Sequence, residues 1–145
     1  MITKVSIGTS FMGALNYNLK KLYSKDESQK AELLATNFVS IKQQSIKNEL
    51  KMIQSLNPRL KRNTFHTSLN FGKDESISNE KMLTIAEDYM KKMGFDNNAY
   101  FIFRHHDTGH PHCHILALRN RFDSTVVSDS KNYQRSGNSN MVWNR

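Results

Sequence analysis

The sequence has a single cysteine, Cys113, among its 145 residues. One cysteine excludes an internal disulfide framework and a multi-cysteine zinc finger, and it is compatible with a reducing compartment. Long apolar runs are also missing, because nowhere do about eighteen consecutive apolar residues occur, and the first residues lack the apolar segment of a signal peptide. These absences lead us to expect a cytoplasmic protein without a membrane segment.

Acidic side chains are in the minority. The chain has 21 Lys and Arg against 13 Asp and Glu, a formal net charge of +8, and the basic residues recur along the sequence from Lys20 to Arg145. A distributed positive charge favours a polyanionic partner, above all nucleic acid. The length suits one domain with a core that needs no disulfide or structural metal.

Hydrophobic periodicity and helix caps predict an alternation of strands and helices. The expected strands are residues 2–7, a short apolar piece at 33–35, the alternating segment 64–71, and the runs 99–105 and 110–119; the expected helices are 12–22, 40–55 and 78–94. This order predicts an α+β domain, an antiparallel β-sheet with helices packed on one face. We assign residues 1–133 to this domain and residues 134–145, which show no periodicity, to a polar tail or truncated end.

Histidines are concentrated at one place: five of the six lie between His105 and His114. Alternate residues of a strand face the same way, so His110, His112 and His114 would share a face. With a hairpin loop at 106–109, His105 would lie opposite His110 on that face. Four candidate ligands result, and three imidazoles would leave coordination positions open, as in catalytic metal sites.

Two further residues bear on this site. Asp107 could orient an imidazole or supply a carboxylate oxygen, although a turn-forming Asp is the alternative. Tyr17 lies about 200° from Leu15 around its helix, on the polar side with Asn18, Lys20 and Lys21. A tyrosine can attack phosphorus when a cation neutralises the phosphate, but an exposed tyrosine without a function is also common.

The motif His-x-Asp-Thr-x-His-x-His-x-His at 105–114 resembles the three-histidine motif of relaxases. These HUH-type endonucleases begin the conjugative mobilisation of plasmids and integrative elements, and the likeness is to the MobA/VirD2-like group from Bacteroides-type elements. Gly13–Tyr17 resembles the amino-terminal nucleophile motif of that group, and Phe65–Phe71 and Met93–Phe95 match its middle segments in the same order.

The resemblance implies a mechanism. His105, His112 and His114 would hold a divalent cation, Mg²⁺ or Mn²⁺ in such enzymes, although three imidazoles also suit zinc, nickel or iron. Tyr17 would attack a phosphate of single-stranded DNA at an origin of transfer, leaving a 5′-phosphotyrosyl DNA and a 3′-hydroxyl that can reverse the reaction. His110 is then the weaker ligand candidate.

The remaining site candidates are less specific. His66, on the polar face of its strand, could contact substrate or orient the site, and a plain hydrogen-bonded histidine is the alternative. The candidates for neutralising DNA phosphates are Lys20, Lys21, Arg104, Arg119 and Arg121. The family resemblance also implies accessory mobilisation proteins and a coupling protein as partners.

Other functions fit parts of the same pattern. A relaxase remnant could bind single-stranded DNA without cutting it, and a rolling-circle replication initiator shares the histidines and the tyrosine chemistry. A zinc-dependent hydrolase would not need Tyr17. The sequence also departs from relatives after residue 136, where they continue with a helix and further sheet.

Overall fold

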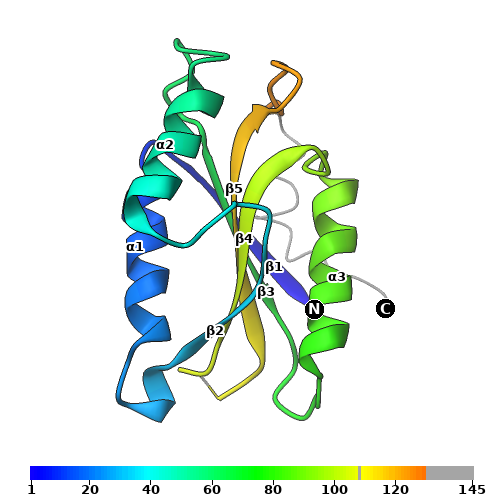
Figure 1. Cartoon of the computed structure of the whole chain (residues 1–145). Helices are drawn as coiled ribbons and strands as arrows, with labels where there is room; N and C mark the ends of the chain where they lie inside the picture. Colours follow the sequence, from blue (N-terminus) through cyan, green and yellow to red (C-terminus); the bar gives the residue numbers. More distant parts are fainter. Residues whose placement is uncertain (108, 130–145) are drawn as a thin grey trace.

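The computed structural model describes residues 1–107 and 109–129, so the predicted tail at 134–145 lies outside the described residues. The described elements form one antiparallel sheet with helices beside it (Figure 1). In chain order they are β1 (Ile2–Gly8), α1 (Phe11–Leu22), the short 3-10 helix η1 (Glu27–Gln29), β2 (Ala31–Thr36), α2 (Gln43–Gln54), β3 (Thr64–Asn70), α3 (Asn79–Lys92), β4 (Asn98–His105) and β5 (His112–Arg121). The predicted order of strands and helices is confirmed, and so is the α+β class.

The five strands lie in the order β1-β3-β5-β4-β2, and each neighbouring pair is antiparallel. The central strand β5 therefore pairs with β3 on one side and β4 on the other. In this register His114 lies opposite Ser68 of β3 and opposite Phe103 of β4. The histidines at the start of β5 are thus placed at the middle of the sheet.

The helices do not share one face of the sheet, in contrast to what the pattern predicts. Ile115 and Ala117 of β5 pack in a cluster with α3, whereas Leu116 and Leu118 pack in a second cluster with α1 and α2. Figure 1 shows α1 and α2 on one side of the sheet and α3 on the other. Because successive residues of a strand face opposite ways, a strand that is apolar at every position needs cover on both faces.

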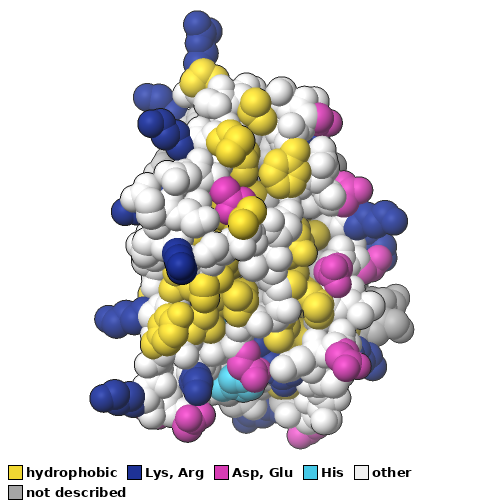
Figure 2. Space-filling view, in the orientation of Figure 1, with side chains coloured by type: hydrophobic (Ala, Val, Ile, Leu, Met, Phe, Trp, Pro, Cys, Tyr) yellow, Lys and Arg dark blue, Asp and Glu magenta, His cyan; other side chains and the backbone are white. Residues whose placement is uncertain are grey.

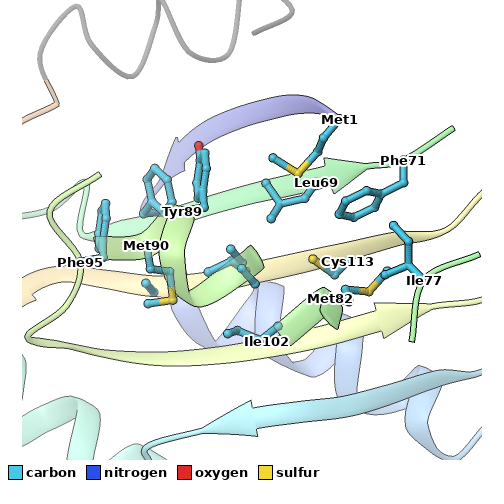
Figure 3. Close-up of a cluster of buried hydrophobic side chains, with 14 of the residues drawn as sticks. Met1, Leu69, Phe71, Ile77, Met82, Tyr89, Met90, Phe95, Ile102 and Cys113 are labelled. Carbon is cyan, nitrogen blue, oxygen red and sulfur yellow. The ribbon is translucent and has the colours of Figure 1, made fainter. Parts of the chain in front are cut away.

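A cluster of buried hydrophobic side chains packs between α3 and the sheet. Tyr89 and Met82 of α3 are fully buried against Ile102 of β4 and Cys113 of β5 (Figure 3). Burying a large apolar side chain stabilises the fold by about 1.5–3 kcal/mol. The histidines on the opposite face therefore lie on strands whose other face is buried under α3.

Helix caps fix where the helices begin and end. The Ser10 hydroxyl accepts a hydrogen bond of 3.0 Å from the Gly13 amide at the start of α1, and Ser78 caps α3 in the same way at 3.1 Å from Lys81. Gly94 follows α3 with a φ of +89°, a conformation that favours glycine. Since α1 begins at its cap, Tyr17 falls two turns into that helix.

The β4–β5 connection is longer than the predicted loop. His105 pairs with His112 and not with His110, so the connection is residues 106–111. Pro111 has no amide hydrogen for the strand ladder, and its carbonyl accepts a hydrogen bond of 2.9 Å from the Phe71 amide instead. His110 therefore leaves the strand, and the expected face of four histidines becomes a face of three.

Candidate active site

Three histidines meet on the sheet face that α1 covers. His105 ends β4, and His112 and His114 lie two residues apart at the start of β5. One ring nitrogen from each lies within 4.8 Å of the others, as a shared metal ion would require. The antiparallel register produces this cluster, because it sets His105 opposite His112 and places His114 next on the same face.

Burial keeps these imidazoles neutral. Burial, followed by the neighbouring imidazoles, lowers the pKa of His114 to about 2 and that of His105 to about 4. The pKa of His112 is also lowered, mainly by burial. A neutral imidazole presents a nitrogen lone pair, which is the form that binds metal.

Two side chains from other elements hold the imidazole rings. His66 of β3 places Nε2 2.8 Å from Nδ1 of His114, and Asn18 of α1 places Oδ1 2.6 Å from Nε2 of His105. Such contacts fix the ring orientation and the tautomer of a metal ligand. The contact of His66 with His114 fits both an orienting histidine and a plain hydrogen-bonded one, two of the alternatives that the sequence left open.

Asn18 is buried, although the sequence led us to expect it on the polar side of α1. Grouped with Tyr17 on the polar side of α1, it is in fact 3% exposed. Asn18 comes three residues after Leu15, so the apolar stripe of the helix already includes its position. The spacing from Leu15 indicates a buried position, whereas the polar side chain of Asn18 suggests an exposed one.

Asp107 and Lys21 form an ion pair beside the histidines. Burial raises the pKa of Asp107, but the hydrogen bond and charge of Lys21 outweigh it and keep the pKa below the usual value. The second carboxylate oxygen, Oδ1, is buried, has no hydrogen bond among the described residues, and lies 3.5 Å from Nε2 of His112. Asp107 therefore lies beside His112, although it is not among the residues whose ligand atoms all lie within 4.8 Å of one another.

These donors fit a divalent cation. Three neutral imidazoles and a neighbouring anionic oxygen supply ligand atoms of the types that divalent metals use. Nitrogen ligands suit zinc, nickel or iron, whereas a carboxylate oxygen is also typical of Mg²⁺ and Mn²⁺ sites. The donor set alone does not select one metal.

Tyr17 lies next to this cluster. Its side chain is 60% exposed, as its helical position predicts, and it lines a pocket of about 270 Å³ together with Asn18, His66 and His114. The Lys21 Nζ stands 4.9 Å from the centre of the Tyr17 ring. Residues from opposite ends of the sequence thus border one space that is open to solvent.

The basic candidates fall into two groups. Lys20 and Lys21 line a second pocket of about 540 Å³ with Tyr17 and Tyr23, on α1 next to the histidines. Three arginines instead support distant parts of the fold: Arg104 donates to Ile77 and Asn79, Arg119 to Arg62 and Val127, and Arg121 to Gly94 and Thr125. The structure does not bring these arginines to the histidines.

Comparison with known proteins identifies a family that matches this sequence. A family model described as relaxase, MobA/VirD2-like, nuclease domain matches residues 17–141, a range that starts at Tyr17 and includes the three histidines. None of the curated proteins matches the sequence significantly. Within residues 1–107 and 109–129, no helix has the length and apolar character needed to cross a membrane.

Proposed function

The chain belongs to the MobA/VirD2-like relaxases, and on this premise we propose that it nicks and rejoins one strand of DNA through Tyr17. Membership of this nuclease family accounts for the DNA-processing activity; the tyrosine, the strand and the site are our proposal. The observation that supports it best is that Tyr17 and His114 line the same pocket.

The proposed step is a transesterification at one phosphate. The Tyr17 oxygen forms a bond to phosphorus while the bond from phosphorus to the 3′-oxygen breaks, which leaves a 5′-phosphotyrosyl DNA and a 3′-hydroxyl. The phenol proton passes to water, since Tyr17 is 60% exposed, and the leaving 3′-oxygen takes up a proton. In the reverse reaction the 3′-hydroxyl attacks the phosphorus, the phosphotyrosyl bond breaks, and the strand is resealed.

The three histidines supply the place for a cofactor. A divalent cation bound there would withdraw negative charge from the scissile phosphate and so ease attack. The chain contributes neutral imidazoles at His105, His112 and His114, and Asn18 and His66 hold the first and third of these in position. We propose Mg²⁺ or Mn²⁺ as the physiological ion, since Asp107 adds a carboxylate oxygen beside the nitrogens.

Lys21 acts as a positioning residue in this proposal. Its ammonium group pairs with Asp107 of the β4–β5 connection and lies over the Tyr17 ring, so it ties the helix that carries the nucleophile to the histidine hairpin. Lys20, which is exposed on the same helix, is the better candidate for a phosphate contact.

The biological setting extends the proposal. Cleavage at an origin of transfer would begin the conjugative mobilisation of a plasmid or integrative element, in the cytoplasm, with accessory mobilisation proteins and a coupling protein as partners. A Bacteroides-type origin for that element stays a prediction from the sequence motifs.

A covalent adduct tests the proposed step. Labelled single-stranded oligonucleotides that together cover the DNA flanking the gene are incubated with the protein and Mn²⁺, then resolved in denaturant. We expect one oligonucleotide to stay attached to the protein, Tyr17→Phe to remove the adduct, and Tyr23→Phe, which changes a neighbouring exposed tyrosine, to retain it. An adduct that survives in Tyr17→Phe would contradict the proposal.

The same assay separates the alternative functions. Binding that weakens steeply with salt, without an adduct, would favour a non-catalytic single-strand-binding module. Zinc-dependent cleavage without an adduct would favour a hydrolase. An adduct formed only at a replication origin would indicate a rolling-circle initiator.

A further inference from the structure

A further pocket lies between α1 and α2, at the opposite end of α1 from Lys20 and Lys21. Its volume is about 590 Å³, and its walls include Ser10, the N-cap of α1, and Met12 of α1, Lys47 and Lys51 from α2, and Leu60 from the segment that follows α2. Neither the histidines nor Tyr17 line it. It is therefore a separate site from the proposed reaction centre.

The segment around this pocket is strongly basic. Residues 42–62 contain Lys42, Lys47, Lys51, Arg59, Lys61 and Arg62 but only one acidic residue, Glu49. Figure 2 shows Lys and Arg side chains along the side of the molecule where α1 and α2 lie, and most Asp and Glu side chains on the side of α3. The pocket thus opens onto a positively charged surface.

Lys47 and Lys51 are the two basic residues in the pocket wall. They are exposed, lie one helical turn apart, and form no ion pair in the part of the chain that the structure describes. Like charges at this spacing repel each other along the helix. Neither lysine has an opposite charge paired with it among the described residues, and a bound anion would supply one.

The pocket adjoins the pocket of Tyr17 through one shared residue. Ser10 lines both this pocket and the pocket of Tyr17, and Tyr17 in turn lines the pocket of Lys20 and Lys21. The three spaces follow α1 from its first residues to its last turn. Ser10 and Tyr17 are seven residues apart, about 10 Å along the helix at about 1.5 Å per residue. A polymer with regularly spaced phosphates could occupy all three spaces at once.

We propose that the pocket between α1 and α2 is a second subsite for the substrate strand, in which Lys47 and Lys51 bind phosphates beyond the one that Tyr17 attacks. The strand then runs along α1, with Tyr17 between Lys20 at one end and the α2 lysines at the other. Met12 and Leu60, both partly buried, offer apolar surface to a base between these phosphate contacts. The inference rests on the proposed function, because its ligand is the same single strand.

Binding without cleavage tests the subsite first. We compare Lys47→Gln/Lys51→Gln with Lys81→Gln/Lys91→Gln, which removes the same charge from exposed positions of α3 on the other face. Affinity for a 20-nucleotide oligothymidylate is measured by fluorescence anisotropy across salt concentrations. We expect the α2 variant to bind about 25-fold more weakly near 0.1 M salt. Its salt slope should fall by about 1.4, because each phosphate contact to a single strand contributes about 0.7.

The outcomes of this comparison are distinct. The α3 variant should stay within about twofold of the wild type, and circular dichroism should show both variants folded. Equal effects of the two double substitutions would overturn the inference, because the lysines would then contribute only through net charge.

Cleavage then tests the path of the strand. Once the adduct has mapped the cleaved phosphate, substrates are shortened from either side, and the single-turnover rate of adduct formation is measured at subsaturating protein. We expect the deficit of Lys47→Gln/Lys51→Gln to disappear when the strand is shortened on one side and to persist when it is shortened on the other. A deficit that persists with both truncations would overturn the proposed path. A wild-type protein that forms no adduct would refute the proposed function, whereas the oligothymidylate comparison would still decide the subsite.

Discussion

Replacing Lys21 by Met should separate binding of DNA from cleavage. The Lys21 ammonium pairs with Asp107, and the two side chains are only 16% and 17% exposed. The same group lies 4.9 Å from the centre of the Tyr17 ring. Lys21, on the same helix as Tyr17, therefore contacts both the Tyr17 ring and the connection that precedes His112.

The structure sets the size of the effect. A partly buried carboxylate left without its partner costs about 1–3 kcal/mol, and a lost cation–π contact about 0.5–1 kcal/mol. We expect the free energy of unfolding to fall by about 2–3 kcal/mol. A displacement of the reacting groups by about 1 Å lowers a rate about 10²-fold, and we expect a loss of that order in the nicking step.

The assay measures the single-turnover nicking rate at saturating oligonucleotide, with affinity measured separately by anisotropy. Lys21→Met should lose about 10²-fold in rate, while its Kd should rise by no more than about fivefold, the share of one phosphate contact near 0.1 M salt. Lys21→Arg should recover part of the rate because it restores the cation. The matched control is Lys20→Met, at the exposed neighbouring position, and it should weaken binding but leave the rate unchanged. Equal effects of Lys21→Met and Lys20→Met, confined to affinity, would refute the positioning role.

Three further outcomes follow from the site and the core. His114→Ala should abolish Mn²⁺ binding in a calorimetric titration, whereas His110→Ala should retain it, since His110 lies outside the strand and outside the cluster of ligand nitrogens; equal affinities of the two variants would contradict the ligand assignment. Asn18→Ala should weaken Mn²⁺ binding by about 10- to 100-fold through loss of the contact to His105, and unchanged affinity would show that the contact does not support the site. Cys113 should resist a thiol-specific disulfide reagent in the folded protein and react fully in denaturant, because it is fully buried and burial raises the pKa of its thiol to about 12; rapid labelling under native conditions would show that the sheet opens there.

The features that could be predicted from the sequence depend on local interactions. Strand alternation at 64–71 and the caps at Ser10 and Ser78 involve residues within a few positions of one another, and each has the predicted role. The exposure of Tyr17 follows in the same way from helical periodicity alone.

The features that could not be predicted depend on contacts between distant segments. The pairing of His105 with His112 is accompanied by a hydrogen bond from the Phe71 amide to Pro111, and Phe71 lies in another part of the chain. The apolar run of β5 indicates that both faces of the sheet are covered, but which helix covers which face is seen only in the folded structure.

The candidate site also combines local features, which could be predicted, with contacts between distant segments, which could not. The residue types and spacing at 105–114 predict a metal site, but the supporting contacts of Asn18 and His66 required the folded arrangement of α1 and β3. The assignment of Arg119 to DNA shows the limit of reasoning from charge, since its guanidinium is buried and bonded to backbone carbonyls.

Peptide mapping of the covalent adduct tests the central claim most directly, namely that Tyr17 attacks a phosphate held beside the three histidines. Trypsin cleaves after Lys4 and Lys20, so Tyr17 is the only tyrosine in the peptide of residues 5–20, and Tyr23 falls in the separate peptide of residues 22–25. The adduct is formed with Mn²⁺, treated with nuclease and trypsin, and analysed by mass spectrometry. The account predicts a nucleotide on Tyr17 in the peptide of residues 5–20, and no adduct from His114→Ala. A nucleotide on the peptide of residues 22–25, or an unchanged yield from His114→Ala, would contradict it.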